Sequence, residues 1–175
     1  MECLKWISGY FYNEHGTTNS TTNSNNNSNS TTNSTTNSTT NYYYLSLIFN
    51  EDKNAWSIHG LWPQYSLKSY PSYCKNVSFD INLLDTIMNE LQNEWYSTEG
   101  PDADFWKHEW EKHGSCMFTP MNELQYFTKA LELFDSIKNN NSLIDKFKKN
   151  KTQSMIPYDQ DFNIIIELTN NNENN

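Results

Sequence analysis

Hydrophobic positions along the chain fall into short periodic segments separated by polar or glycine- and proline-containing stretches. Residues 42–50 (YYYLSLIFN) are rich in aromatic and aliphatic side chains, which predicts a β-strand. The alternating segment 56–59 (WSIH) predicts a second, shorter strand that closes at Gly60, and a loop-rich stretch follows to about Cys74. Near the other end, the continuous apolar run 162–168 (FNIIIEL) predicts a buried strand.

Helical periodicity marks several segments between these strands. Apolar side chains recur at helical spacing over residues 80–96 and 121–138. Residues 104–113 end at Gly114, where a left-handed residue is expected after a helix, and residues 142–149 form a weaker fourth candidate. Strands and helices are segregated without a regular βαβ alternation, so the pattern predicts an α+β fold.

Residues 17–41 are all Ser, Thr or Asn and offer no apolar surface to bury. We therefore expect a disordered low-complexity region at residues 1–41, one domain at residues 42–168, and a disordered tail at residues 169–175.

The charge balance limits the classes of function. The chain has 12 Lys and Arg against 21 Asp and Glu, a net charge of −9, which argues against a protein that holds polyanions mainly through charge. No apolar run approaches the roughly 18 residues of a membrane span, so we expect no membrane partner. Residues 1–16 lack the apolar centre of a signal peptide.

The strongest chemical signal is the distribution of histidines. Three of the four lie in two aromatic-flanked segments, WSIHGLWPQ (56–64) and FWKHEWEKHGSC (105–116). At 100° per residue, four ionisable residues of the second segment share one arc of about 140°: His108, Glu109, Lys112 and His113. Ordinary pairing on a helix surface explains part of this pattern, because Glu109 and His113 are four residues apart. The aromatic neighbours, and His59 at a strand end elsewhere in the chain, favour a functional site.

Two other kinds of site fit less well. A zincin helix needs histidines four residues apart, whereas His108 and His113 are five apart, so we expect no metal. Ser115 or Cys116 beside His113 lacks the context of a nucleophile elbow. Two histidines, a carboxylate and a lysine suit general acid–base catalysis of phosphoryl transfer, which requires no metal or cofactor.

The two histidine segments resemble the active-site segments of the ribonuclease T2 family of endoribonucleases. The similarity extends from about Trp56 to Leu133 and includes SYPSYC at residues 69–74. It implies an antiparallel sheet packed against several helices. It also implies cleavage of single-stranded RNA, in which the 2′-hydroxyl attacks the adjacent phosphate to give a 2′,3′-cyclic phosphate and a free 5′-hydroxyl.

The resemblance also implies roles for individual residues. His113 is the expected general base, His59 the general acid and His108 a phosphate ligand, while Glu109 and Lys112 support the transition state. Trp62 and Tyr70 match positions that sandwich a base, and Gln64 stands where many members carry Asp. Cys74 and Cys116 match a family disulfide, whereas Cys3 is unmatched.

The resemblance leaves two expectations about the whole protein. Family members are secreted, lysosomal or vacuolar, and we expect a monomer in one of these compartments. Family members also continue beyond this chain's last residue, so the domain is expected to be short at its C-terminus. The alternative function is a catalytically silent T2-like domain with a binding or storage role.

Overall fold

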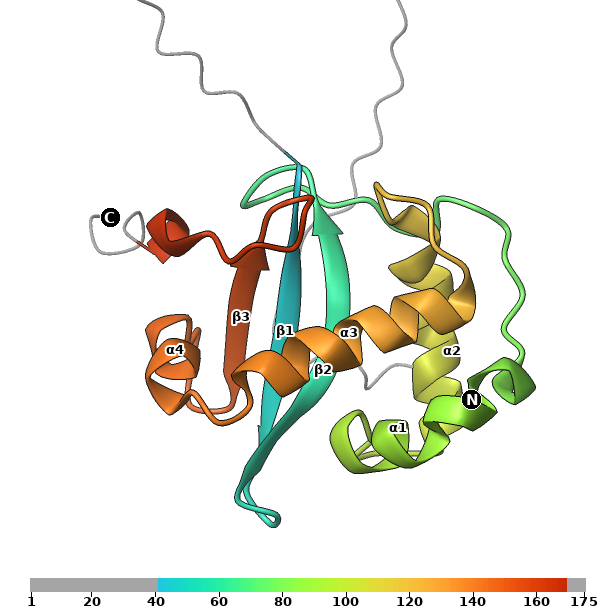
Figure 1. Ribbon diagram of the computed structural model, residues 1–175, viewed down its shortest axis with the longest axis horizontal. Coiled ribbons are helices and arrows are strands. Elements are labelled where there is room, and N and C mark those ends of the chain that lie inside the picture. Colours follow the sequence, from blue (N-terminus) through green and yellow to red (C-terminus); the bar gives the residue numbers. More distant parts are fainter. Residues whose placement is uncertain (1–40, 170–175) are drawn as a thin grey trace, which may run out of the picture. The chain divides into compact units, whose positions relative to one another are not determined.

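Three antiparallel strands form a sheet at the centre of residues 41–169, the part of the chain that the computed structural model describes (Figure 1). The strands are β1 (Tyr42–Asn50), β2 (Ala55–Gln64) and β3 (Gln153–Tyr158), in the order β2-β1-β3. The disorder expected for residues 1–40 and 170–175 falls outside the described residues.

Helices surround this sheet, and Figure 1 shows the longest of them, α3, crossing one of its faces. The predicted α+β architecture is therefore confirmed. In chain order the helices are η1 (Ile81–Ile87, a 3-10 helix), α1 (Met88–Glu94), α2 (Asp102–Lys112), η2 (Gly114–Cys116, 3-10), α3 (Glu123–Ile137), α4 (Asn141–Lys146) and η3 (Ile166–Thr169, 3-10).

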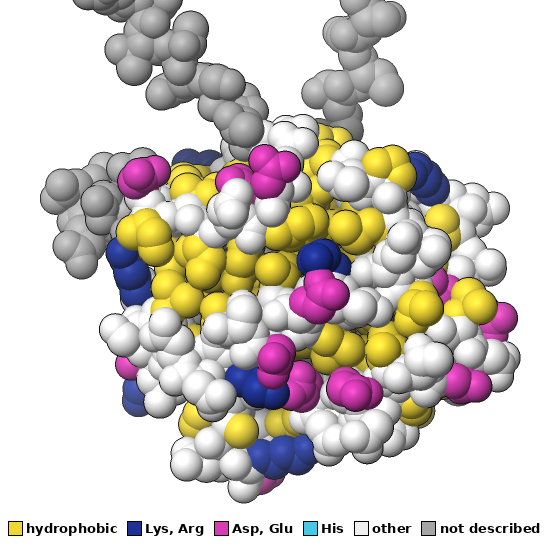
Figure 2. Space-filling view, viewed as in Figure 1, with side chains coloured by type: hydrophobic (Ala, Val, Ile, Leu, Met, Phe, Trp, Pro, Cys, Tyr) yellow, Lys and Arg dark blue, Asp and Glu magenta, His cyan; other side chains and the backbone are white. Residues whose placement is uncertain are grey.

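The hydrophobic core lies between β1 and α3. Tyr43, Leu45 and Leu47 alternate along β1 and are fully buried, as expected for the central strand of a sheet that is covered by a helix. The helix begins at a capping box in which Asn122 and Gln125 satisfy each other's backbone N–H groups. Apolar side chains also gather on the surface around α3, and no histidine is visible on that face (Figure 2).

The strand β2 is longer than predicted. It continues through Gly60 and Pro63 to Gln64 instead of closing at Gly60. This strand forms an edge of the sheet, where proline needs no hydrogen-bonding neighbour on its open side. A glycine within the strand allows another element to approach closely, as described for the site below.

The hydrophobic pattern does not predict β3, and the strand that it predicts at residues 162–168 is wrong. Asp159 turns the chain immediately after β3, and its carboxylate accepts hydrogen bonds from the backbone N–H groups of Asp161 and Asn163. Only a short stretch then lies beside β3, where Ile165 N–H donates to the Pro157 carbonyl, before η3 begins. Pro157 inside β3 is tolerated because this strand forms the other edge of the sheet.

Two side chains from helical segments hold the backbone of β2. The indole of Trp95, which follows α1, donates to the carbonyl of His59 at 3.1 Å. The hydroxyl of Tyr126, in α3, donates to the carbonyl of Leu61 at 3.1 Å. Both donors are fully buried. The two carbonyls flank Gly60, so these hydrogen bonds fix the part of β2 from which His59 projects.

Removing one of these donors is expected to destabilise the domain. Tyr126→Phe leaves the buried Leu61 carbonyl without its partner, which costs about 1–3 kcal/mol of the free energy of unfolding. Urea denaturation followed by circular dichroism measures this loss. Tyr96→Phe is a matched control, because the buried Tyr96 hydroxyl has no hydrogen-bond partner among the described residues. Equal stability of the two variants would contradict the assigned role of Tyr126.

Candidate active site

His59 occupies an irregular position in β2. Ser46 of β1 pairs with Gly60 and the next residue, Leu47, pairs with Ile58, so His59 is an extra residue opposite the regular ladder. Such a β-bulge redirects a side chain out of the regular alternation, and bulges are frequent beside active sites. The bulge gives His59 an orientation that the alternating sequence WSIH does not predict.

A hydrogen bond joins the two predicted segments. The indole Nε1 of Trp62, in β2, donates to Oε2 of Glu109, in α2, at 2.8 Å. Gly60 makes this approach possible, because a Cβ atom at that position would lie 2.1 Å from both Glu109 Oε2 and Trp62 Nε1. The absent side chain of Gly60 therefore allows α2 to pack directly against β2.

The same indole ring contacts both histidines that are candidates for proton transfer. The rings of Trp62 and His113 are stacked, with centroids 5.2 Å apart, and the His59 ring lies edge-on to Trp62 at 5.0 Å. Phe105 also contacts His59, at 5.8 Å. His113 is buried, and its Nδ1 atom has no hydrogen-bond partner among residues 41–169. Trp62 thus brings His59, His113 and Glu109 into one cluster.

Lys112 and His108 complete the cluster from α2. The positive charge of Lys112 lowers the pKa of all three histidines, after the larger effect of their burial. The charge of His108 acts in the same direction on His59 and His113. The structure therefore places the five expected catalytic residues within electrostatic reach of one another.

Burial controls the protonation of this cluster. It lowers the pKa of His59 to about 4 and holds the pKa of His113 well below its ordinary value of 6.5. Burial also raises the pKa of the Glu109 carboxyl to about 8, although the Trp62 hydrogen bond and Lys112 act in the opposite direction. Near neutral pH the free protein therefore has uncharged histidines and a largely neutral carboxyl group.

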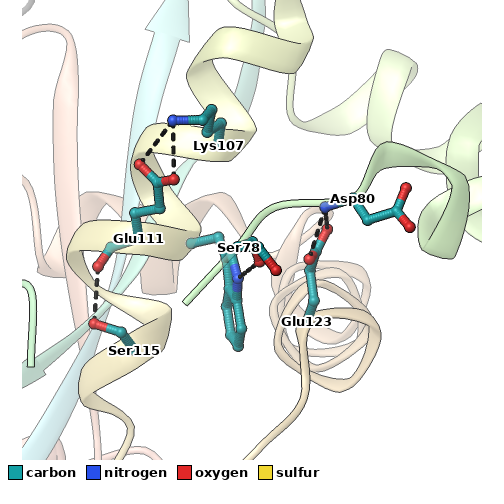
Figure 3. Close-up of polar contacts among 7 residues, drawn as sticks. Ser78, Asp80, Lys107, Glu111, Ser115 and Glu123 are labelled. Atoms are coloured by element: carbon teal, nitrogen blue, oxygen red, sulfur yellow. Dashed lines mark hydrogen bonds and ion pairs between the residues drawn. The ribbon is translucent and has the colours of Figure 1, made fainter. Parts of the chain in front are cut away.

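The loop before Cys74 is fastened to the end of α2. Tyr73 N–H donates to the Lys112 carbonyl at 2.9 Å, and Cys74 N–H donates to Ser115 Oγ at 3.1 Å. The expected disulfide between Cys74 and Cys116 is confirmed, with Cα atoms 5.1 Å apart. Figure 3 shows Lys107 and Glu111 on α2 and Ser115 just beyond its end, in η2, where the Ser115 hydroxyl donates to the Glu111 carbonyl.

The expected base-binding residues lie at different depths. The Tyr70 ring is exposed, with its centroid 6.4 Å from that of His113, so Tyr70 and Trp62 both approach this histidine. Gln64 is buried at the end of β2, where strand alternation puts it on the same face as Trp62. Gln64 does not take part in the ring contacts and hydrogen bonds described above.

Three residues that shape this site have no functional signal of their own in the sequence. Trp95 and Tyr126 lie within the ranges 80–96 and 121–138 that are predicted as helices, and they hold the backbone of β2. The ring of Tyr73 lies 6.4 Å from that of His108. The only available signal for Tyr73 was its place in the segment SYPSYC, because side-chain contacts between loops have no periodicity to detect.

Two further properties concern cofactors and membranes. Within residues 41–169, no group of three or more His, Cys, Asp and Glu side chains is arranged to hold a metal ion. No helix in the same part of the chain is long and apolar enough to cross a membrane.

Sequence comparisons find ribonucleases among the relatives of this chain. Ribonuclease DdI of Dictyostelium discoideum is 34% identical over 125 residues, which are 70% of this chain and 53% of that protein. The extracellular ribonuclease LE of Solanum lycopersicum is 39% identical over 85 residues, 46% of this chain and 37% of that protein. The chain therefore spans about half the length, or less, of these curated relatives.

The fold is shared with a solved structure. Ribonuclease MC1 from bitter gourd seeds matches with a TM-score of 0.60 at 18% identity, covering 71% of this chain and 93% of that chain. The sequence model of the "Ribonuclease T2 family" matches residues 32–161 of this chain. This range includes all the site residues discussed above. The protein thus belongs to the ribonuclease T2 family.

Proposed function

We propose that this protein cleaves single-stranded RNA by acid–base transphosphorylation without a metal or cofactor. The observation that carries the proposal is the joint contact of one indole, Trp62, with His59, His113 and Glu109. Two imidazoles that contact one ring are close enough together for one to take a proton from the attacking hydroxyl and the other to give a proton to the leaving oxygen.

In the proposed reaction, His113 removes the proton of the RNA 2′-hydroxyl. The 2′-oxygen then attacks the adjacent phosphorus, the bond from phosphorus to the 5′-oxygen breaks, and His59 donates a proton to that leaving oxygen. The products are a 2′,3′-cyclic phosphate and a 5′-hydroxyl, so protons and atoms balance. The low pKa of His113 suits a base that must be uncharged at the start of the reaction.

The remaining residues act on the phosphate and on the base. Lys112 and His108 offset negative charge on the phosphate oxygens, and a protonated Glu109 donates a hydrogen bond to one of them. Its pKa of about 8 keeps this carboxyl protonated in acidic solution. Trp62 and Tyr70 hold the base next to the scissile phosphate. Their rings both approach His113, which supports a base position beside the proposed proton acceptor.

We further propose that the protein acts as a monomer in an acidic or extracellular compartment. The tomato relative is named an extracellular ribonuclease. The disulfide between Cys74 and Cys116 fits an oxidising environment. A low pH also increases the protonated fraction of His59, which the proposed mechanism requires.

Replacing either proton-transfer histidine should abolish most of the activity. His59→Phe and His113→Phe are each expected to lower kcat by about 100- to 10,000-fold, since each removes one proton-transfer step. The assay is cleavage of a short single-stranded RNA at about pH 5 in excess EDTA, with product ends identified by mass spectrometry. His15→Phe, at the one histidine outside both segments, is the matched control.

Three results of this assay would contradict the proposal. They are full activity of either histidine variant, loss of wild-type activity in EDTA, and products without 2′,3′-cyclic phosphate ends. A folded wild-type protein that does not cleave RNA would favour a silent binding or storage domain instead. A cooperative thermal transition shows whether the protein used in the assay is folded.

The electrostatics of the cluster predict an acidic pH profile. In the free protein, kcat/KM requires neutral His113 and protonated His59, whose pKa values both lie below 6.5. We therefore expect kcat/KM to decrease as the pH rises above about 4, where His59 loses its proton. A bound phosphate favours the charged imidazoles, so the corresponding limbs of kcat should lie at higher pH.

Removing the charge of Lys112 should move the pH profile of kcat/KM to higher pH. Lys112→Gln takes away a cation that disfavours protonated His59 and His113, so both pKa values rise. Both limbs of the kcat/KM profile should then move to higher pH at constant ionic strength. NMR titration of the imidazole protons measures the same change without catalysis. An unchanged profile, or one that moves to lower pH, would show that Lys112 does not act on these histidines.

A further inference from the structure

Tyr73 has a backbone conformation that is unusual for its side chain. Its φ angle is 50°, in the left-handed region. Asn54 and Phe162 also have positive φ angles. Asn54 lies in the turn between β1 and β2, where asparagine tolerates this region, and the Phe162 ring stacks on the buried Tyr43. For a bulky aromatic residue the same conformation is strained, and strained residues concentrate at functional sites.

The surrounding structure holds Tyr73 in this conformation. Its N–H donates to the carbonyl of Lys112, one residue before His113. The next residue, Cys74, is bonded to Cys116 and also donates its N–H to Ser115. Two consecutive loop residues are thus attached once to the last residue of α2 and twice to η2, and these contacts impose the unfavourable φ angle.

The ring of Tyr73 is left largely in solvent by this arrangement. Tyr73 is 58% exposed, which is the largest exposed fraction among the exposed large hydrophobic residues of the described part of the chain. The ring centroid lies 6.4 Å from that of His108 at an interplanar angle of 80°. The strained conformation therefore does not serve to bury this ring in the core, but holds it beside the residue proposed to bind phosphate.

Tyr70 and Tyr73 form a pair in this loop. The Tyr70 ring approaches His113, the C-cap of α2, and the Tyr73 ring approaches His108 within α2, so each of these histidines has one exposed tyrosine beside it. Burial raises the pKa of the Tyr73 phenol, and the charges of Glu111 and Glu109 raise it further, so the phenol stays uncharged. An uncharged, exposed ring suits stacking on a nucleotide base.

We propose that Tyr73 is a stacking platform for the base of a nucleotide adjoining the one held by Trp62 and Tyr70. This inference rests on the proposed action on single-stranded RNA and extends it to a second base. With a net charge of −9, the protein has few cations to spare for a long phosphate backbone. Base stacking on aromatic rings provides affinity that does not depend on net charge.

The test measures binding rather than cleavage. The ligands are a nucleoside 3′-phosphate and an RNA tetranucleotide with 2′-fluoro groups, which lacks the attacking hydroxyl. Tyr73→Asn removes the ring and places a residue that tolerates positive φ in its position. We expect about a tenfold increase in the tetranucleotide Kd, since stacking contributes about 1–3 kcal/mol per base. The Kd for the nucleoside 3′-phosphate should stay within about twofold, and the Tm should not fall.

Matched variants separate stacking from other effects. Tyr65→Asn is the control, because Tyr65 is 45% exposed and its ring contacts Phe118 instead of a histidine. Tyr73→Phe keeps the ring and should bind both ligands as the wild type does. If Tyr73→Asn fails to fold, Tyr73→Leu retains an apolar side chain without an aromatic face and should show the same selective loss.

The outcomes are distinguishable from those of the cleavage assay. An unchanged tetranucleotide Kd in the Asn or Leu variant, or an equal loss for both ligands, would overturn the stacking role of Tyr73. Failure of the wild type to produce cyclic phosphate ends would instead overturn the proposed reaction, while length-dependent binding through Tyr73 is still measured. A selective loss for the tetranucleotide supports the second base position.

Discussion

The hydrogen bond from the Trp62 indole to the Glu109 carboxyl determines how the two halves of the site meet. The two residues are 47 positions apart, and they connect the strand that carries His59 with the helix that carries His108 and His113. This contact requires a residue without a side chain at position 60, because a Cβ atom there would collide with both hydrogen-bonding atoms. It also needs a correctly placed strand, which the bulge and the hydrogen bonds from Trp95 and Tyr126 provide. A small set of polar contacts thus sets the spacing of the proposed catalytic groups.

Desolvation is the largest influence on the protonation of this site. His113 and Glu109 are buried and His59 is partly buried beside a cation, so desolvation favours the neutral forms of all three. Charges that develop on a bound phosphate would interact more strongly here than in water, because the local dielectric constant is lower. The disulfide and the loop contacts close this region against α2, which reduces the motion of the groups that must act together.

Elements with a strong and uninterrupted pattern were predictable. The apolar stripe of α3 and the aromatic and aliphatic run of β1 each match one regular geometry, and both exist close to the expected bounds. The prediction for residues 80–96 was helical, but the segment divides into η1 and α1. The apolar run after Asp159 was mistaken for a strand because sequence hydrophobicity does not reveal that a carboxylate closes a turn there.

The sequence by itself determined which chemical groups the site contains and which helix presents most of them. The grouping of His108, Glu109, Lys112 and His113 follows from helical geometry, because at 100° per residue all four fall within one arc of about 140°. Tertiary structure alone decided the orientation of His59 through the β-bulge, the approach of α2 over Gly60, and the left-handed conformation of Tyr73. These features depend on contacts between residues distant in sequence, and local periodicity carries no information about such contacts.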